Sequence, residues 1–132
     1  MKKILLCDDE HYILTAAEIK LRRANFEVRT VRDGEEGWGI LQEWMPDVLV
    51  TDCQMPHLDG RGLAARCRDH EHTRDLPILM LTVKGYEWSQ DQLRDELGIL
   101  GVMLKPFSPR ELLHCVEQII ETGVFKPPRT YV

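Results

Sequence analysis

Three carboxylates of this chain stand directly after apolar runs, at the places where buried strands would end. Asp8 and Asp9 follow the run 4–7, and Asp52 follows the run 48–51. A carboxylate at the carboxyl end of a buried strand can act as a nucleophile. Like charges held close together disfavour one another, and a divalent cation between them removes the conflict. These acids therefore predict a nucleophile, a cation site, or both.

A hydroxyl and an amine occupy the same kind of place after two later runs. Thr82 ends the run 78–81, and Lys105 ends the run 102–104. The carboxyl ends of the strands in an open parallel sheet lie along one edge, where ligands bind. We therefore expect the three acids, Thr82 and Lys105 to form one polar site at that edge.

The strands that would hold these side chains recur as short apolar runs with helical patterns between them. The runs span 3–7, 27–31, 48–52, 78–82 and 101–105. The helical patterns occupy about 11–24, 35–44, 60–69 and 87–97, and a last one follows Ser108. This alternation predicts right-handed crossovers and a parallel sheet covered by helices on both faces.

The chain closes with a capped helix and an irregular segment. Ser108, Pro109 and Glu111 have the spacing of a capping box with proline at the first helical position. Residues 124–132 contain two consecutive prolines and show no periodicity, which is typical of a tail or a linker. We therefore expect one domain over residues 1–123, followed by a tail or the stub of a linker.

The composition is that of an ordinary globular domain, with 132 residues, 43% of them hydrophobic and 30% charged. A net charge of −5, without a cluster of Lys and Arg, argues against direct binding of nucleic acid. The four cysteines lack C-x-x-C spacing, which predicts reduced intracellular thiols. The first apolar stretch is too short for a signal peptide or a membrane span. We therefore expect a cytoplasmic protein without membrane contact.

The order of these motifs resembles the receiver domain of two-component response regulators, of the kind found in chemotaxis regulators. The acidic pair comes first, then Asp-x-x-Met-Pro at 52–56, then Thr82, then Lys105-Pro106. The resemblance covers roughly residues 2–122. It implies a flavodoxin-like, doubly wound α/β fold in three α/β/α layers, with five helices and five parallel strands in the order 2-1-3-4-5.

The resemblance also implies a Mg²⁺ site. Asp9 and Asp52 would bind the ion directly, Asp8 would bind it through water, and the backbone carbonyl of Gln54 would complete the protein's share. The residue types agree with this, because Mg²⁺ prefers hard oxygen ligands and retains several waters.

By the same resemblance, a phosphohistidine on a histidine kinase or a histidine phosphotransfer protein is the donor, and Asp52 is the phosphoacceptor. Catalysis of phosphoryl transfer is mostly positioning and charge stabilisation, which Lys105 would provide. The Thr82 hydroxyl would then bind the phosphoryl group and change a face made by the helix at 87–97, the strand at 101–105 and the last helix. A downstream protein or an output domain would bind that face. Such a domain is a signalling component of a phosphorelay, not an enzyme with a separate substrate.

Four positions depart from the family pattern. Val102 stands where the family usually has an aromatic residue that moves inward with the threonine, and Val83 stands where it has a small residue. Leu100 and Gly101 replace acidic residues that often form a salt-bridged dimer face. We therefore expect a weaker or different switch, and a more apolar face that suits a partner helix.

Two other functions are compatible with parts of the pattern. A phosphate-independent adaptor would keep the fold and signal by binding alone, and the valines at 83 and 102 favour it mildly. A phosphatase with an aspartate nucleophile also uses Asp, Thr, Lys and Mg²⁺, but it has Asp-x-Asp after its first strand, with the second Asp as acid and base. Here Asp8 and Asp9 are adjacent, and Gln54 stands two positions after Asp52.

Two further side chains near these motifs have structural interpretations. Strand alternation turns Cys53 away from Asp52, which predicts a core position rather than a redox role. Trp88 begins a polar helical pattern. We expect its ring to be exposed, where it could anchor a partner.

Overall fold

The computed structural model describes residues 1–83 and 86–128. Within these ranges, five strands alternate with five α-helices. The strands are β1 (Lys3–Cys7), β2 (Glu27–Val31), β3 (Val48–Asp52), β4 (Ile78–Val83) and β5 (Gly101–Lys105). The α-helices are α1 (His11–Arg23), α2 (Gly34–Leu41), α3 (Gly60–Asp69), α4 (Gln90–Leu97) and α5 (Pro109–Thr122), and a 3-10 turn, η1 (Glu71–Thr73), follows α3.

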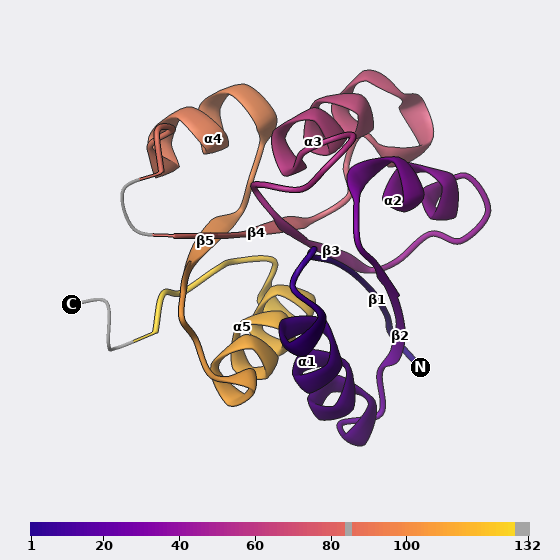
Figure 1. The fold of residues 1–132 in the computed structure, drawn as a ribbon, viewed down its shortest axis with the longest axis vertical. Coiled ribbons are helices and arrows are strands. Elements are labelled where there is room, and N and C mark those ends of the chain that lie inside the picture. The colour runs from indigo at the N-terminus through magenta and orange to yellow at the C-terminus, as the bar shows by residue number, and fades with distance from the viewer. Residues whose placement is uncertain (84–85, 129–132) are drawn as a thin grey trace.

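All five strands are parallel and lie in the order β2-β1-β3-β4-β5. Helices α1 and α5 cover one face of the sheet, and α2, α3 and α4 cover the other (Figure 1). The expected fold, with its strand order and three layers, is confirmed. The strand register pairs Asp52 with Leu81 and Val83 with Lys105, so the ends of β3, β4 and β5 lie along one edge.

Alternate residues of the central strands fill two hydrophobic cores, as the pleat of a strand requires. Leu5, Leu49 and Met80 are fully buried beneath α2, α3 and α4. Ile4 and Val50 are fully buried on the opposite face, beneath α1 and α5. All four cysteines are buried and free, and no helix in the described part of the chain has the length and apolar character needed to cross a lipid bilayer.

The strand bounds agree with the sequence pattern to within one residue, whereas two helix bounds differ. Helix α2 ends at Leu41 rather than near 44. Helix α4 begins at Gln90 rather than 87, because Ser89 and Gln92 form a reciprocal capping box at its start. The Ser108 capping box of α5 is present as expected.

The first part of the irregular C-terminal segment packs against the domain. The half-buried Phe125 ring joins the core beneath α1 and α5 and lies against Gly101, where a Cβ atom would collide with it. Cys115 Sγ lies 3.8 Å from the carbonyl oxygen of Lys126. Residues 124–128 therefore rest on β5 and α5, and the remainder of the expected tail, 129–132, lies outside the described residues.

Two glycines of α2 should respond in opposite ways to replacement by alanine. A Cβ at Gly34 would collide with the carbonyl oxygen of Leu58, while a Cβ at Gly39 meets nothing within 4 Å. We expect Gly34→Ala to lower the free energy of unfolding by about 2 kcal/mol or more. Gly39→Ala should raise it by about 0.5–1 kcal/mol, because alanine favours a helix interior. Urea denaturation measures both, and a Gly34→Ala protein as stable as the Gly39→Ala protein would contradict this packing.

Candidate functional site

The carboxyl ends of β1, β3 and β5 bring acidic and basic side chains to one edge of the sheet. Asp8 follows β1, Asp52 ends β3, and Lys105 ends β5. The amine Nζ of Lys105 lies 2.9 Å from Asp8 Oδ2 and 3.0 Å from Asp52 Oδ2. The structure thus brings together three of the residues that the sequence pattern singles out.

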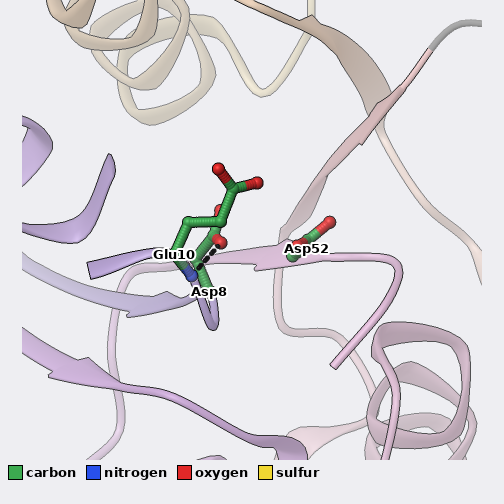
Figure 2. Close-up of side chains that lie close together, drawn as sticks. All are labelled: Asp8, Glu10 and Asp52. Atoms are coloured by element: carbon green, nitrogen blue, oxygen red, sulfur yellow. Dashed lines mark hydrogen bonds between the residues drawn. The ribbon is translucent and has the colours of Figure 1, made fainter. Parts of the chain in front are cut away.

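A third carboxylate, Glu10, completes this group. Its Oε1 lies 3.1 Å from Lys105 Nζ, and carboxylate oxygens of Asp8, Glu10 and Asp52 lie within 4.8 Å of one another. Figure 2 shows Glu10 beside Asp8, with the Glu10 N–H donating to Asp8 Oδ1 at 2.9 Å, and with Asp52 across from them on β3. Sequence reasoning misses Glu10, because its partner Lys105 is 95 residues away and no local pattern marks it.

Two of the expected cation ligands lie at the margin of the group. Asp9 is exposed, its carboxylate is not one of the three that converge, and its backbone carbonyl accepts a hydrogen bond from Arg32 at 3.2 Å. Gln54 is exposed, and its backbone N–H points to Asp52 Oδ1 at 3.5 Å. The carboxylates that converge with that of Asp52 are therefore those of Asp8 and Glu10.

Asp52 is only 6% exposed, and its surroundings make it a stronger base than an ordinary aspartate. Burial, followed by the charge of Asp8, raises the pKa of Asp52 to about 6, while Lys105 acts in the opposite direction. The carboxylate is thus mainly ionised at neutral pH, but it has a proton affinity typical of a tuned catalytic group.

Lys105 remains a cation despite its surroundings. Burial alone would lower the pKa of Lys105, but hydrogen bonds and charge interactions with Asp8 and Asp52 raise it above its ordinary value. The ammonium therefore compensates part of the negative charge of three carboxylates. A negative balance remains that a divalent cation would neutralise.

The donor set fits a hard divalent cation. The ligand atoms that converge are carboxylate oxygens, without a histidine or cysteine among them. Such a set suits Mg²⁺, which accepts one or two carboxylates and keeps several waters. The raised pKa of Asp52, which results from burial beside another acid, is the kind of conflict that a bound cation relieves.

Thr82 lies on β4 close to this edge, and its side chain is turned to other partners. It is 5% exposed, and its hydroxyl donates to the carbonyl oxygen of Val83 at 3.4 Å. The Thr82 side chain also interacts with Cys53, whose pKa it lowers. Its hydroxyl is therefore near the site but engaged outside it.

The loop between β3 and α3 is fixed close to Asp52 by several contacts. The Gly60 N–H donates to the Cys53 carbonyl at 3.0 Å, and Asp59 caps α3 by accepting from the Gly62 N–H at 2.7 Å. His57, with a φ of 68°, places Nδ1 3.2 Å from Asp33 Oδ2. These hydrogen bonds thus anchor the main chain between Asp52 and α3.

The raised pKa gives a stability prediction for protein kept free of divalent cations. Between pH 3.8 and about 6 the folded state holds the Asp52 proton more tightly than the unfolded chain does, so stability falls as pH rises through this range. At pH 7 we expect the free energy of unfolding of Asp52→Asn to exceed that of wild type by about 1–3 kcal/mol. The two free energies of unfolding should converge near pH 4. Urea titrations in EDTA test this, and a variant less stable at pH 7 would contradict it.

A sequence model of the response regulator receiver domain matches residues 4–117. The chain is 39% identical over 127 residues to the alkaline phosphatase synthesis transcriptional regulatory protein PhoP of Bacillus subtilis, covering 96% of this chain and 52% of that protein. It spans about half the length of the curated relatives it matches. The fold and the sequence together place the chain in the family of response regulator receiver domains.

Solved structures agree with this assignment. The chemotaxis response regulator CheY4 of Vibrio cholerae superposes with a TM-score of 0.82 at 31% identity, covering 90% of this chain and 98% of that one. The receiver domain of a sensor histidine kinase from Pseudomonas aeruginosa superposes with a TM-score of 0.81 at 27% identity, covering 92% and 98%, and holds a magnesium ion in its active-site cleft. The chain is thus a receiver domain with a phosphoacceptor role in two-component signalling.

Proposed function

We propose that Asp52 is the phosphoacceptor of this receiver domain. The observation that carries the proposal is the placement of a buried carboxylate at the end of β3, 3.0 Å from Lys105 Nζ and beside two further acids. An Asp52 oxygen would attack the phosphorus of a phosphohistidine. The P–N bond breaks, and the imidazole leaves with the electron pair and takes up a proton. The phosphorus–oxygen bond formed is that of an acyl phosphate.

Lys105 and Thr82 have distinct roles in this proposal. Lys105 holds a positive charge next to the attacking carboxylate, where it stabilises negative charge on the transferring oxygens. Thr82 donates its hydroxyl to the phosphoryl group once this has arrived, which requires it to leave its present acceptor. That movement would change the segment 83–86, of which residues 84 and 85 lie outside the described residues.

We further propose that Mg²⁺ is the cofactor and that it neutralises the acidic group when bound. The donor chemistry of the site and the magnesium ion in the P. aeruginosa receiver domain support this. By resemblance, the ligands are Asp8, Asp9, Asp52 and the carbonyl of Gln54. The convergent carboxylates in the structure are those of Asp8, Glu10 and Asp52, so Glu10 competes with Asp9 for the remaining ligand position.

We infer that the partners are a phosphohistidine donor, either a histidine kinase or a histidine phosphotransfer protein, and a target protein or output domain that binds the face made by α4, β5 and α5. Residues 1–123 would form the receiver and 124–132 a linker or tail. PhoP is named as a transcriptional regulator. With a net charge of −5 in this chain, we propose that residues outside it contact DNA where DNA is involved.

Incubation with acetyl phosphate tests the proposed function against its alternatives. We expect one phosphoryl group per chain, dependent on Mg²⁺, and no turnover of small phosphate esters. A chain that takes up no phosphoryl group under these conditions would instead be a phosphate-independent adaptor. Multiple turnover of phosphate esters would indicate a phosphatase.

The identity of the cation ligands has its own test. Isothermal titration with Mg²⁺ should show binding to wild type, and Asp9→Ala should weaken it at least tenfold, because one direct ligand is lost. Glu10→Gln is the matched comparison, since it removes a neighbouring charge of the same kind. If Glu10→Gln abolishes binding and Asp9→Ala leaves it unchanged, Glu10 is the ligand and the assignment of Asp9 is wrong.

A further inference from the structure

The aromatic residue missing at position 102 has a structural counterpart in the segment that precedes α4. Val102 is 3% exposed and belongs to the core beneath α2, α3 and α4, and the half-buried rings of Tyr86 and Trp88 pack against that core. The expectation of an exposed Trp88 is therefore wrong. Its ring is covered by a side chain from α3, a contact that the local sequence does not encode.

Arg61, on the first turn of α3, holds this segment. Its guanidinium carbon lies 4.5 Å from the centroid of the Trp88 ring and 5.9 Å from that of Tyr86. Its Nη2 is 3.3 Å from Glu87 Oε1. Stacking and charge pairing thus attach residues 86–88 to α3, which begins eight positions after Asp52. We refer to these contacts of Arg61 with Tyr86, Glu87 and Trp88 as the Arg61 clamp.

Cys53 connects this segment to the switch threonine. Its side chain is fully buried, and it interacts with Thr82 on one side and with Tyr86, which packs against the same core, on the other. Burial raises the pKa of Cys53 to about 11 and that of Tyr86 to about 12. The Cys53 thiol and the Tyr86 hydroxyl therefore keep their protons at neutral pH, as the Thr82 hydroxyl does. The contacts among these three side chains form a continuous path from β4 to the Arg61 clamp.

We propose that Cys53 and Tyr86 are positioning residues for Thr82, and that the Arg61 clamp is the element that phosphorylation releases. At rest, the Thr82 hydroxyl donates to the Val83 carbonyl, and the Thr82 side chain interacts with Cys53. When Thr82 turns to a phosphoryl group, Cys53 loses Thr82 as a partner, its contact with Tyr86 weakens, and Trp88 separates from Arg61. The signal then leaves through residues 86–88 rather than through position 102.

This inference rests on the proposed function, in which Asp52 is the phosphoacceptor. A ligand shifts a two-state equilibrium only by its differential contacts with the two states. The contacts of Cys53, Tyr86 and Arg61 belong to the resting state. Removing one of them should therefore favour the active state and tighten binding of a phosphoryl mimic at Asp52. A purely structural role for these side chains would leave that affinity unchanged.

The test follows the three tryptophan indole N–H resonances by NMR while beryllofluoride and Mg²⁺ are added. Trp38→Phe, Trp44→Phe and Trp88→Phe assign the signals. We expect the Trp88 signal to move and the other two to stay. Tyr86→Phe, which deletes only a hydroxyl, and Arg61→Gln should each favour the active state. Each should lower the beryllofluoride concentration needed for half-saturation by roughly threefold to tenfold.

Arg66→Gln is the matched control. Arg66 is also on α3, pairs with Glu35 at 3.0 Å and lies 5.9 Å from the Trp38 ring, so this change removes a similar contact away from the path. It should leave both the Trp88 signal and the affinity unchanged. Arg61→Lys keeps the charge but not the planar stacking group. Its affinity for beryllofluoride should lie between those of Arg61→Gln and wild type.

Phosphoryl uptake from acetyl phosphate, measured by intact mass, separates the two levels of inference. If wild type takes up no phosphoryl group, the proposed function fails. If it is fully modified while the Trp88 signal stays in place, or if Tyr86→Phe and Arg61→Gln both bind beryllofluoride as wild type does, the positioning role is overturned and the proposed function stands.

Discussion

Asp52→Asn is expected to take up no phosphoryl group from acetyl phosphate and Mg²⁺, whereas wild type takes up one per chain. An amide is a poor nucleophile, and among the described residues Asp52 alone combines a strand-end position with the Lys105 amine at 3.0 Å and a pKa raised by burial. Intact mass spectrometry measures the uptake directly.

Asp47→Asn is the matched control, because Asp47 stands before the opposite end of the same strand. Its Oδ2 accepts the Lys3 N–H at 2.7 Å, and asparagine can keep that hydrogen bond. We expect the Asp47→Asn protein to be modified to the same extent as wild type. Full modification of Asp52→Asn would place the acceptor elsewhere.

Lys105→Met is expected to slow phosphoryl uptake by about two to three orders of magnitude, the usual cost of removing a group that stabilises charge in the transition state. Methionine retains most of the apolar stem of the Lys105 side chain, and that side chain as a whole is only 8% exposed. The initial rate at saturating Mg²⁺ is the measurement.

The control for this change is Lys2→Met, because Lys2 is exposed at the far end of β1 and lies 4.0 Å from Asp47. Its rate should match that of wild type. A Lys105→Met rate within threefold of wild type would show that the amine has no part in the transfer. Lys105 would then be only a resting-state partner of the three acids.

The sheet could be predicted from the sequence because four of its strands are short apolar runs bounded by polar residues, and β2 alternates apolar with polar residues. The carboxyl ends of those runs carried Asp8, Asp52, Thr82 and Lys105, and a parallel arrangement was sufficient to bring them to one edge. The sequence also contains the signal for the start of α4, since Ser89 and Gln92 have capping-box spacing, but the expected helix was extended back to Glu87.

What could not be predicted depends on contacts between distant segments. Glu10 joins the site through Lys105, Trp88 is covered by Arg61, and Phe125 fills the space beside Gly101. In each case the local pattern shows only a charged or aromatic residue near an element end. The partner is 24 or more residues away, too far for helical or strand periodicity to report it.

Chemical mapping of the modified residue tests the central claim most directly. Borohydride reduces an acyl phosphate of aspartate to homoserine, so phosphorylated protein that is reduced, digested and sequenced by mass spectrometry should carry homoserine at position 52 alone. Homoserine at Asp8 or Asp9, or a phosphate that survives reduction on the Thr82 hydroxyl, would contradict the assignment of Asp52 as the acceptor.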